Sequence, residues 1–299
     1  MPPHRLLKSL LILLFCAWQG GISNAAASAG PAMERPLPDT SVHQAGNKQL
    51  VASTGLSVPN GAGQQRILFI LASSKVHGSS NIPASISFGE VVHAWDTFQA
   101  AGYAVDFVTP DGGDVPILDP YVGKEVEPRL QDDRIMRGLR NTATPAQIDP
   151  SLYRAVYYVG GSNAMYGVAE NRALQDIAMH VYERNGGVVS AVCHGTAGIV
   201  NLKLAGGQSL LAGKRITGYP EEHEDRSAAY FKEFPFQMRQ AVQSRGGLFN
   251  VVDSNDPYIE VDGRVMTGQN YRSAAPLAAA VVDALRKLPN PRTGQTRRD

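Results

Sequence analysis

Short apolar runs that alternate with helical segments constrain the fold of this chain more than any other feature of its sequence. The first run, residues 66–72, is apolar almost throughout, which is typical of a strand buried on both faces of a sheet. We expect further strands at 104–108, 155–159, 187–192 and 215–217, and helices at 88–101, around 174–182, from 194 and at 273–287. This alternation predicts an α/β protein: a three-layer sandwich with a mostly parallel central sheet and helices on both faces.

Two other segments stand out between these elements. Residues 258–261 and 264–267 flank Asp262-Gly263, which is a strong signal for a β-hairpin. Residues 110–133 form an unusually long polar loop, and loops of this length in compact domains are often functional.

The first 27 residues have the organisation of a secretory signal peptide. Arg5 and Lys8 precede an apolar run at 10–18, and small residues follow at 23–27. A membrane anchor is the alternative, but this run is much shorter than the roughly 20 residues that span a bilayer. Cys16 lacks the small preceding residue that lipidation requires. We therefore expect a cleaved signal and a periplasmic or secreted protein that does not stay at the membrane.

Composition divides the rest of the chain. Residues 28–64 are rich in Ala, Gly, Pro, Ser and Gln without an apolar period, and predict a flexible leader before a folded domain at 65–288. Residues 289–299 read as a polar tail. Signal cleavage changes the 28 Lys and Arg to 26, against 27 Asp and Glu. Without an excess of positive charge, nucleic-acid binding has no electrostatic support.

The chain has two cysteines, Cys16 and Cys193. This count excludes a disulfide-dense scaffold and a multi-thiolate zinc site. Loss of the signal peptide leaves Cys193 as a single thiol without an internal partner. Such a thiol in an exported protein is either buried and inert or reactive and used.

The pattern around Cys193 favours a reactive thiol. A buried strand stops at this residue, and His194-Gly195 follows at the expected start of a helix. This is the arrangement of a nucleophile elbow, in which a strained turn exposes the side chain at the carboxyl end of a strand. We expect the helix N-terminus to lower the pKa of the thiol, and Gly195 to let the backbone pass close to the nucleophile. A buried structural cysteine is the alternative.

Gly160-Gly161 ends the neighbouring strand at the same edge of the sheet. A glycine pair in this place can direct backbone N–H groups at an oxyanion that develops beside Cys193. An ordinary strand-to-loop turn is the simpler interpretation of the same residues.

Glu90 opens the helix after the first strand, so it too should lie at the carboxyl edge of the sheet. Its carboxyl group would hydrogen-bond the thiolate when protonated or act as a base when ionised. The alternative is an acidic residue that stabilises a helix N-terminus. Glu90 and His93 also have the spacing of metal ligands, but no third ligand converges on them, and we expect no metal.

Three acidic residues, Glu221, Glu222 and Glu224, follow the strand at 215–217. A nucleophile and its base need a third group that orients the base. One of these carboxylates would hold the His194 ring; acidic residues at a helix start are the alternative.

Four motifs occur in a consistent order: Tyr158-Val-Gly-Gly, Ala191-Val-Cys-His-Gly-Thr-Ala-Gly, Ile216-Thr-Gly-Tyr-Pro-Glu-Glu-His-Glu and Asp262-Gly-Arg-Val-Met-Thr-Gly-Gln-Asn270. They resemble the ThiJ/PfpI superfamily, which has a flavodoxin-like, class I glutamine amidotransferase-like fold. The resemblance covers residues 65–287. It is greatest to the branch of heat-shock chaperones and glutathione-independent glyoxalases.

The resemblance implies roles for the residues singled out above. Cys193 would be the nucleophile, His194 its partner and Glu90 the carboxyl group that tunes the thiol. Glu224 matches the third acidic position best, with Glu221 second. Gly161, next to Gly160, would form the oxyanion pocket with the His194 backbone N–H.

The sequence departs from related proteins at two points that bear on the expected substrate and reaction. Ser162 stands where the branch often has a histidine, which weakens any statement about the substrate. The chain also lacks the His-x-Glu that true glutaminases carry after the cysteine, so we do not expect glutamine hydrolysis.

We therefore expect an enzyme that acts on small reactive carbonyls as a homodimer, with neither metal nor organic cofactor. Conversion of methylglyoxal to D-lactate without glutathione is the leading hypothesis. A stress-response chaperone or redox sensor that oxidises the same cysteine is a rival from another class. A cysteine hydrolase or deglycase is the enzymatic rival, because one fold supports several activities.

Overall fold

The computed structural model describes residue 56 and residues 64–289. The predicted signal peptide, nearly all of the predicted leader and all but the first residue of the predicted tail lie outside these residues, and stay predictions.

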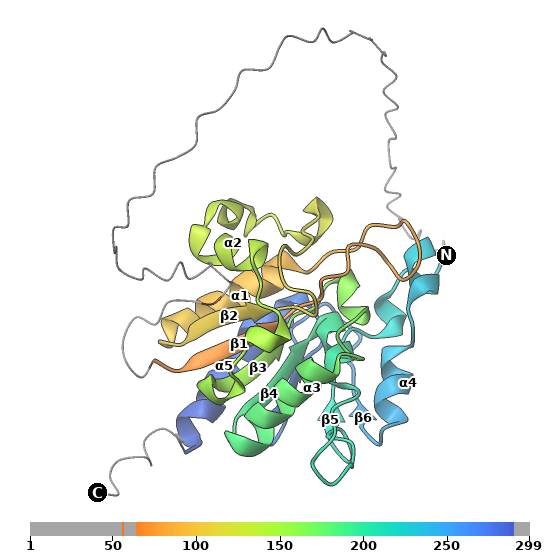
Figure 1. Cartoon of the computed structure of the whole chain (residues 1–299). Helices are drawn as coiled ribbons and strands as arrows, with labels where there is room; N and C mark the ends of the chain where they lie inside the picture. Colours follow the sequence, from red (N-terminus) through yellow and green to blue (C-terminus); the bar gives the residue numbers. More distant parts are fainter. Residues whose placement is uncertain (1–55, 57–63, 290–299) are drawn as a thin grey trace, which may run out of the picture. The chain divides into compact units, whose positions relative to one another are not determined.

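A six-stranded sheet forms the centre of the described domain (Figure 1). Its strands lie in the order β2-β1-β3-β4-β8-β7, and all neighbours are parallel except β7 and β8, which form the predicted hairpin. The strands are β1 (Arg66–Ile70), β2 (Ala104–Val108), β3 (Tyr153–Tyr158), β4 (Val188–Val192), β7 (Ile259–Asp262) and β8 (Val265–Gly268). The mostly parallel sheet predicted from the sequence is confirmed.

Helices cover both faces of this sheet (Figure 1). One face packs against α1 (Phe88–Ala100), α2 (Asp133–Arg140) and α5 (Ala274–Lys287). The other packs against α3 (Arg172–Met179), a turn of 3₁₀-helix at Cys193–Ile199, and α4 (Met238–Gln243). The predicted three-layer arrangement is therefore also confirmed.

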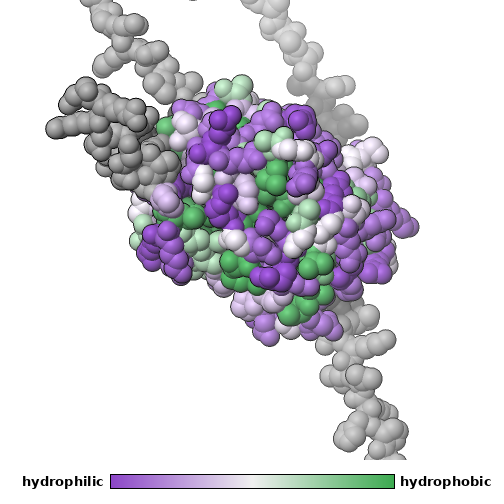
Figure 2. All heavy atoms as spheres, turned by 90° about the horizontal axis from the view of Figure 1, so that it is seen from below, coloured by the Kyte–Doolittle hydropathy of each residue, from purple (hydrophilic) through white to green (hydrophobic). Residues whose placement is uncertain are grey.

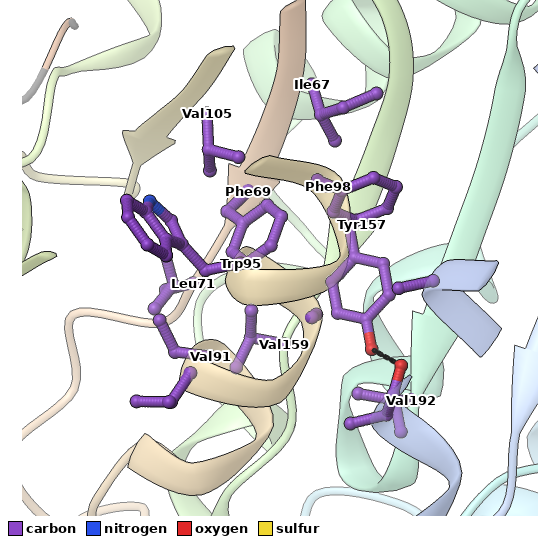
Figure 3. Close-up of a cluster of buried hydrophobic side chains, with 14 of the residues drawn as sticks. Ile67, Phe69, Leu71, Val91, Trp95, Phe98, Val105, Tyr157, Val159 and Val192 are labelled. Atoms are coloured by element: carbon purple, nitrogen blue, oxygen red, sulfur yellow. Dashed lines mark hydrogen bonds between the residues drawn. The ribbon is translucent and has the colours of Figure 1, made fainter. Parts of the chain in front are cut away.

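Alternate residues of each strand enter the two cores, as the pleat of a β-strand requires. In β1, Ile67 and Phe69 lie in one core, while Leu68 and Ile70 lie in the other. The Phe69 ring stacks on that of Tyr157, with centroids 5.0 Å apart. Figure 3 shows these two rings between strands and helix α1. The continuous apolar run at 66–72 thus reflects burial on both faces.

Tyr157 also joins the sheet to helix α5. Its hydroxyl donates a hydrogen bond to the Ala274 carbonyl (3.3 Å), which is the dashed line in Figure 3. This satisfies a buried phenol and places the first turn of α5 beside the carboxyl end of β3.

The structure adds elements that the sequence did not reveal. Helix α2 follows the long polar loop, whose residues also form 3₁₀ turns at Asp119–Tyr121 and Glu127–Gln131. The strand expected at 215–217 is present as β5 (Arg215–Ile216), but it lies outside the central sheet and pairs with the unexpected strand β6 (Leu248–Phe249) in a small separate sheet. The helix expected from His194 is a 3₁₀-helix that already includes Cys193.

The surface in Figure 2 is mostly hydrophilic, with hydrophobic residues in small patches among polar ones. No helix within the described residues has the length and apolarity that a membrane span requires.

Candidate active site

Cys193 occupies the strained turn that the sequence predicted. It follows the last residue of β4 and has φ +55°, the only positive φ of a non-glycine residue in the described part of the chain. This left-handed conformation costs an ordinary residue roughly 1–2 kcal/mol. Strain of this kind concentrates at functional sites because surrounding structure has to maintain it. The nucleophile-elbow geometry is therefore present.

Gly195 is needed for a close approach between two backbones. A Cβ atom at this position would lie 2.4 Å from the carbonyl oxygen of Tyr158, at the end of β3. The sequence suggested a close passage of the backbone beside the nucleophile, and the close contact at Gly195 is with the neighbouring strand β3. Because glycine has no Cβ atom, the 3₁₀-helix can begin directly against the end of β3.

Glu90 lies in the first turn of α1 and is 1% exposed. Its Oε2 accepts a hydrogen bond from the Gly160 N–H (2.8 Å), and its carboxyl group also hydrogen-bonds the side chains of Cys193 and Ser87. Burial raises the pKa of Glu90 from 4.5 to about 8, because a low-dielectric environment disfavours the charged form. At neutral pH the carboxyl group is therefore mostly protonated.

The pKa of the Cys193 thiol is raised, and the sequence prediction of a lowered pKa is wrong. Burial is the main cause, followed by the nearby Glu90 carboxyl group, although the His194 backbone N–H acts in the opposite direction. Desolvation of a thiolate that is only 7% exposed outweighs the short 3₁₀-helix behind it. At rest the site holds a thiol beside a protonated carboxyl group.

His194 connects the thiol to a second carboxylate. Its Nδ1 lies 3.6 Å from Cys193 Sγ, and its Nε2 lies 2.6 Å from Glu224 Oε1. A proton on Nε2 that is donated to Glu224 leaves Nδ1 as the acceptor that faces the thiol. The Tyr219 ring packs against the imidazole, with centroids 4.7 Å apart. Ring orientation is thus determined from two sides.

The structure brings Glu224, and not Glu221, to His194. Glu221 is buried and its Oε1 accepts a hydrogen bond from the Arg239 N–H (2.9 Å) in the first turn of α4. Glu222 forms an ion pair with the Arg239 guanidinium (2.6 Å). Two of the three acidic residues therefore hold a helix end, which was the alternative interpretation for the group.

Gly160 and Gly161 have different roles in the site. The Gly160 N–H is occupied by Glu90, so the predicted oxyanion donor narrows to Gly161 together with His194. Gly161 has φ +112° and lines the cavity above Cys193. A Cβ atom on Gly161 would lie 2.4 Å from the backbone of Ser85 and Ser87, so only glycine fits.

A cavity of about 600 Å³ opens above Cys193. Besides the predicted residues, its walls include side chains that the sequence analysis missed: Ser87, Tyr121, Glu125, Tyr219, Tyr230 and Tyr271. Two of these, Tyr121 and Glu125, come from the long polar loop, so this loop forms part of the site. The Tyr230 hydroxyl donates to Glu224 Oε2 (3.1 Å). Of these residues only Tyr219 lies within one of the four motifs, because the others converge from distant segments.

His93 does not join Glu90 in a metal site. Its Nε2 lies 3.4 Å from Glu125 Oε1, whereas Glu90 faces the thiol. Across the described residues, no group of three or more His, Cys, Asp or Glu side chains is arranged to hold a metal ion.

Comparison with known proteins identifies the family. The DJ-1/PfpI family matches residues 85–284. This chain belongs to the DJ-1/PfpI family. The superfamily that the four motifs indicated is thereby confirmed, and the matched region contains Glu90, both glycines, the Cys-His pair and Glu224.

Similar proteins carry glyoxalase names. The chain is 28% identical to the glutathione-independent glyoxalase HSP31 of Saccharomyces cerevisiae, over 74% of this chain and 98% of that protein. It is 28% identical to glyoxalase 3 of Candida albicans, over 65% of this chain and 87% of that protein. These similarities agree with the branch that the sequence suggested.

Solved structures resemble the fold over the same region. The glyoxalase III of Candida albicans has a TM-score of 0.66 and 27% identity, and covers 74% of this chain and 97% of its own. The Rapid Encystment Protein of Francisella tularensis has a TM-score of 0.69 and 25% identity, over 74% and 99% of the two chains.

The raised pKa of Glu90 predicts how stability depends on pH. The unfolded chain loses this proton near pH 4.5 and the folded chain near pH 8, so Glu90 makes folding less favourable as pH rises between these values. Glu90→Gln removes this effect while keeping a side chain of the same shape. We expect the variant to gain about 3 kcal/mol relative to wild type between pH 4.5 and pH 7.5, measured by chemical denaturation.

The exposed variant Glu170→Gln provides the matched control and should follow the wild type at both pH values. A difference between Glu90→Gln and wild type that is constant over this pH range would show that the carboxyl group is ionised throughout.

Tyr230→Phe tests whether the Tyr230 hydroxyl positions the triad of Cys193, His194 and Glu224. Loss of its hydrogen bond to Glu224 leaves the His194 ring less firmly oriented. We expect alkylation of Cys193 by iodoacetamide to slow about fivefold, and stability to fall by only about 1 kcal/mol. The rate is measured by mass spectrometry of the Cys193 peptide. Tyr182→Phe, away from the cavity, is the control, and equal rates in all three proteins would refute the positioning role.

Proposed function

We propose that this protein is an exported, glutathione-independent glyoxalase that converts methylglyoxal to D-lactate through a covalent bond to Cys193. The observation that carries the proposal is the position of one thiol between a protonated carboxyl group and the Nδ1 of a carboxylate-bound imidazole. The names of the similar proteins in yeasts point to the same reaction.

The first step forms a hemithioacetal. His194 Nδ1 accepts the thiol proton, and the sulfur attacks the aldehyde carbon of methylglyoxal. The aldehyde oxygen takes the proton of Glu90, which lies against the sulfur, while the N–H groups of Gly161 and His194 stabilise the developing oxyanion. Glu90 becomes a carboxylate beside the carbon that must next lose a proton.

The second step moves hydrogen between the two carbons. Glu90 removes the proton from the former aldehyde carbon to give an enediol, and returns it to the neighbouring carbon. His194 carries the hydroxyl proton from one oxygen to the other. The product is a lactoyl thioester of Cys193: the aldehyde carbon has been oxidised and the ketone carbon reduced, so no external oxidant is needed.

Water completes the cycle. Glu90, again a carboxylate after the second step, deprotonates a water molecule that attacks the thioester. His194, oriented by Glu224, returns its proton to the leaving sulfur, so that the product acid is released and both groups regain their resting states. The same three side chains thus serve both halves of the reaction.

The resting thiol argues against a primary role as a redox sensor. Sensor cysteines are exposed and have low pKa values, because the thiolate is the species that peroxide oxidises. Cys193 is 7% exposed and its pKa is raised. Addition to a carbonyl that occupies the cavity agrees better with this environment.

Purified protein is expected to convert methylglyoxal to lactate without glutathione, and Cys193→Ala to lower kcat/KM at least a thousandfold. In the wild type, kcat/KM should fall as pH rises through about 8, because Glu90 then loses the proton that the aldehyde oxygen receives in the first step. An assay for D-lactate over pH 6–9 measures both. Turnover by Cys193→Ala at the wild-type rate would refute the mechanism.

Export is a separate part of the proposal. The basic start, the short apolar run and the small residues at 23–27 support removal of the signal before secretion or release to the periplasm. The intact mass of the protein from its native cells should correspond to a chain that begins between residues 26 and 28. A mass that includes residues 1–25 would contradict cleavage.

A further inference from the structure

The cavity is much larger than methylglyoxal requires. Its volume of about 600 Å³ lies within the roughly 300–1,000 Å³ range of sites that enclose drug-sized ligands, whereas methylglyoxal is a three-carbon molecule. If Cys193 reacts with the aldehyde end of a substrate, most of the cavity is left for whatever the ketone carbon carries.

Four tyrosines line this remaining space: Tyr121, Tyr219, Tyr230 and Tyr271. Tyr219 packs on His194 and the Tyr230 hydroxyl hydrogen-bonds Glu224, so these two side chains hold the triad in place. The other two are Tyr121, from the long loop, and Tyr271, from the segment before α5. Aromatic side chains in such a wall attract a planar ring by stacked or edge-to-face packing.

Tyr271 is held firmly in this wall. Its hydroxyl donates a hydrogen bond to Glu125 in the long loop, 146 residues away in the chain. Gly89 and Gly123 make room for it, since a Cβ atom at either position would lie within 2.4 Å of the Tyr271 side chain. The His93 ring meets the tyrosine edge-on at 5.5 Å. The Tyr271 ring is thus enclosed by helix α1, by the loop at 110–133 and by its own segment before α5.

The charges around the cavity point to an uncharged substituent. Glu125 is an anion whose pKa is lowered by the Tyr271 hydrogen bond, and Glu224 is bonded to His194. Glu90 is mostly protonated. Among the described lining residues, the carboxylates of Glu125 and Glu224 are therefore accompanied by one guanidinium, that of Arg272. An anionic substituent meets no excess of positive charge here.

We propose that the preferred substrates of this site are aryl 2-oxoaldehydes, whose aromatic ring lies against Tyr271 and Tyr121 while the aldehyde faces Cys193. This rests on the proposed glyoxalase reaction and assigns its substrate class. With phenylglyoxal the aldehyde carbon is oxidised, the ketone carbon is reduced and one water is added, which gives mandelate by the same steps.

Three probes separate ring recognition from size. Phenylglyoxal should have kcat/KM at least tenfold above that of methylglyoxal, and also above that of cyclohexylglyoxal, which has a similar size but no aromatic face. Tyr271→Leu should lower kcat/KM for phenylglyoxal about tenfold, mainly through KM, and should lower it at least fivefold more for phenylglyoxal than for methylglyoxal. Tyr182→Leu is the control outside the cavity.

Tyr271→Phe separates the ring from its hydrogen bond. It should keep most of the preference for phenylglyoxal, because it retains the aromatic face. A loss equal to that of Tyr271→Leu would mean that the bond to Glu125 matters and that the ring does not contact substrate. Equal kcat/KM values for phenylglyoxal and cyclohexylglyoxal in the wild type would overturn the proposal.

Binding of acetophenone, which lacks the aldehyde, tests the ring site without turnover. Ligand-observed NMR should show binding to wild type that is about tenfold weaker in Tyr271→Leu. If no 2-oxoaldehyde is converted but this difference is found, the glyoxalase proposal fails and the ring site stands. Conversion of methylglyoxal with no acetophenone binding would mean that the ring site fails and the glyoxalase reaction stands.

Discussion

The buried contact between Glu90 and Cys193 is the constraint on which the rest of the site depends. Two acidic groups lie together out of water, and both keep their protons at neutral pH because neither charge is solvated. The contact leaves no space at Gly160, where a Cβ atom would lie 2.5 Å from Glu90 Oε2 and 2.8 Å from Cys193 Cβ. This contact therefore fixes the relative positions of three elements: the first turn of α1, the end of β3 and the end of β4.

The left-handed turn at Cys193 is maintained by the strands around it. Its carbonyl oxygen accepts a hydrogen bond from the Tyr219 N–H (3.3 Å), and β4 is paired on both sides, with β3 and β8. Since Tyr219 also packs on the His194 ring, the segment that stabilises the strained backbone also orients the base. Backbone conformation and catalytic geometry are thus coupled through the same few contacts.

The sequence predicted what depends on local pattern. Strands buried on both faces appear as unbroken apolar runs, and the elbow appears as a strand that stops at Cys193 before small residues. Helix α2 was missed because its sequence, DRIMRGLR, has only three large apolar residues and a glycine. The predicted sign of the pKa shift of the Cys193 thiol was wrong. The position of a helix can be read from the sequence, whereas the burial of this side chain depends on how distant segments pack over it. The choice of Glu224 over Glu221 and the Tyr271–Glu125 contact depend on how distant loops pack.

A neutral resting pair has a consequence for the exported, single-thiol protein that we propose. A thiolate kept ready in an oxidising compartment would be exposed to oxidation throughout the life of the protein, and no second cysteine could rescue it. In the proposed mechanism the thiol gives up its proton when a carbonyl is in place, because only then can the substrate oxygen receive the proton of Glu90. Nucleophilicity is therefore tied to occupancy of the cavity, and the same burial that makes the thiol unreactive towards solvent oxidants makes its reaction selective for what the tyrosine-lined walls admit.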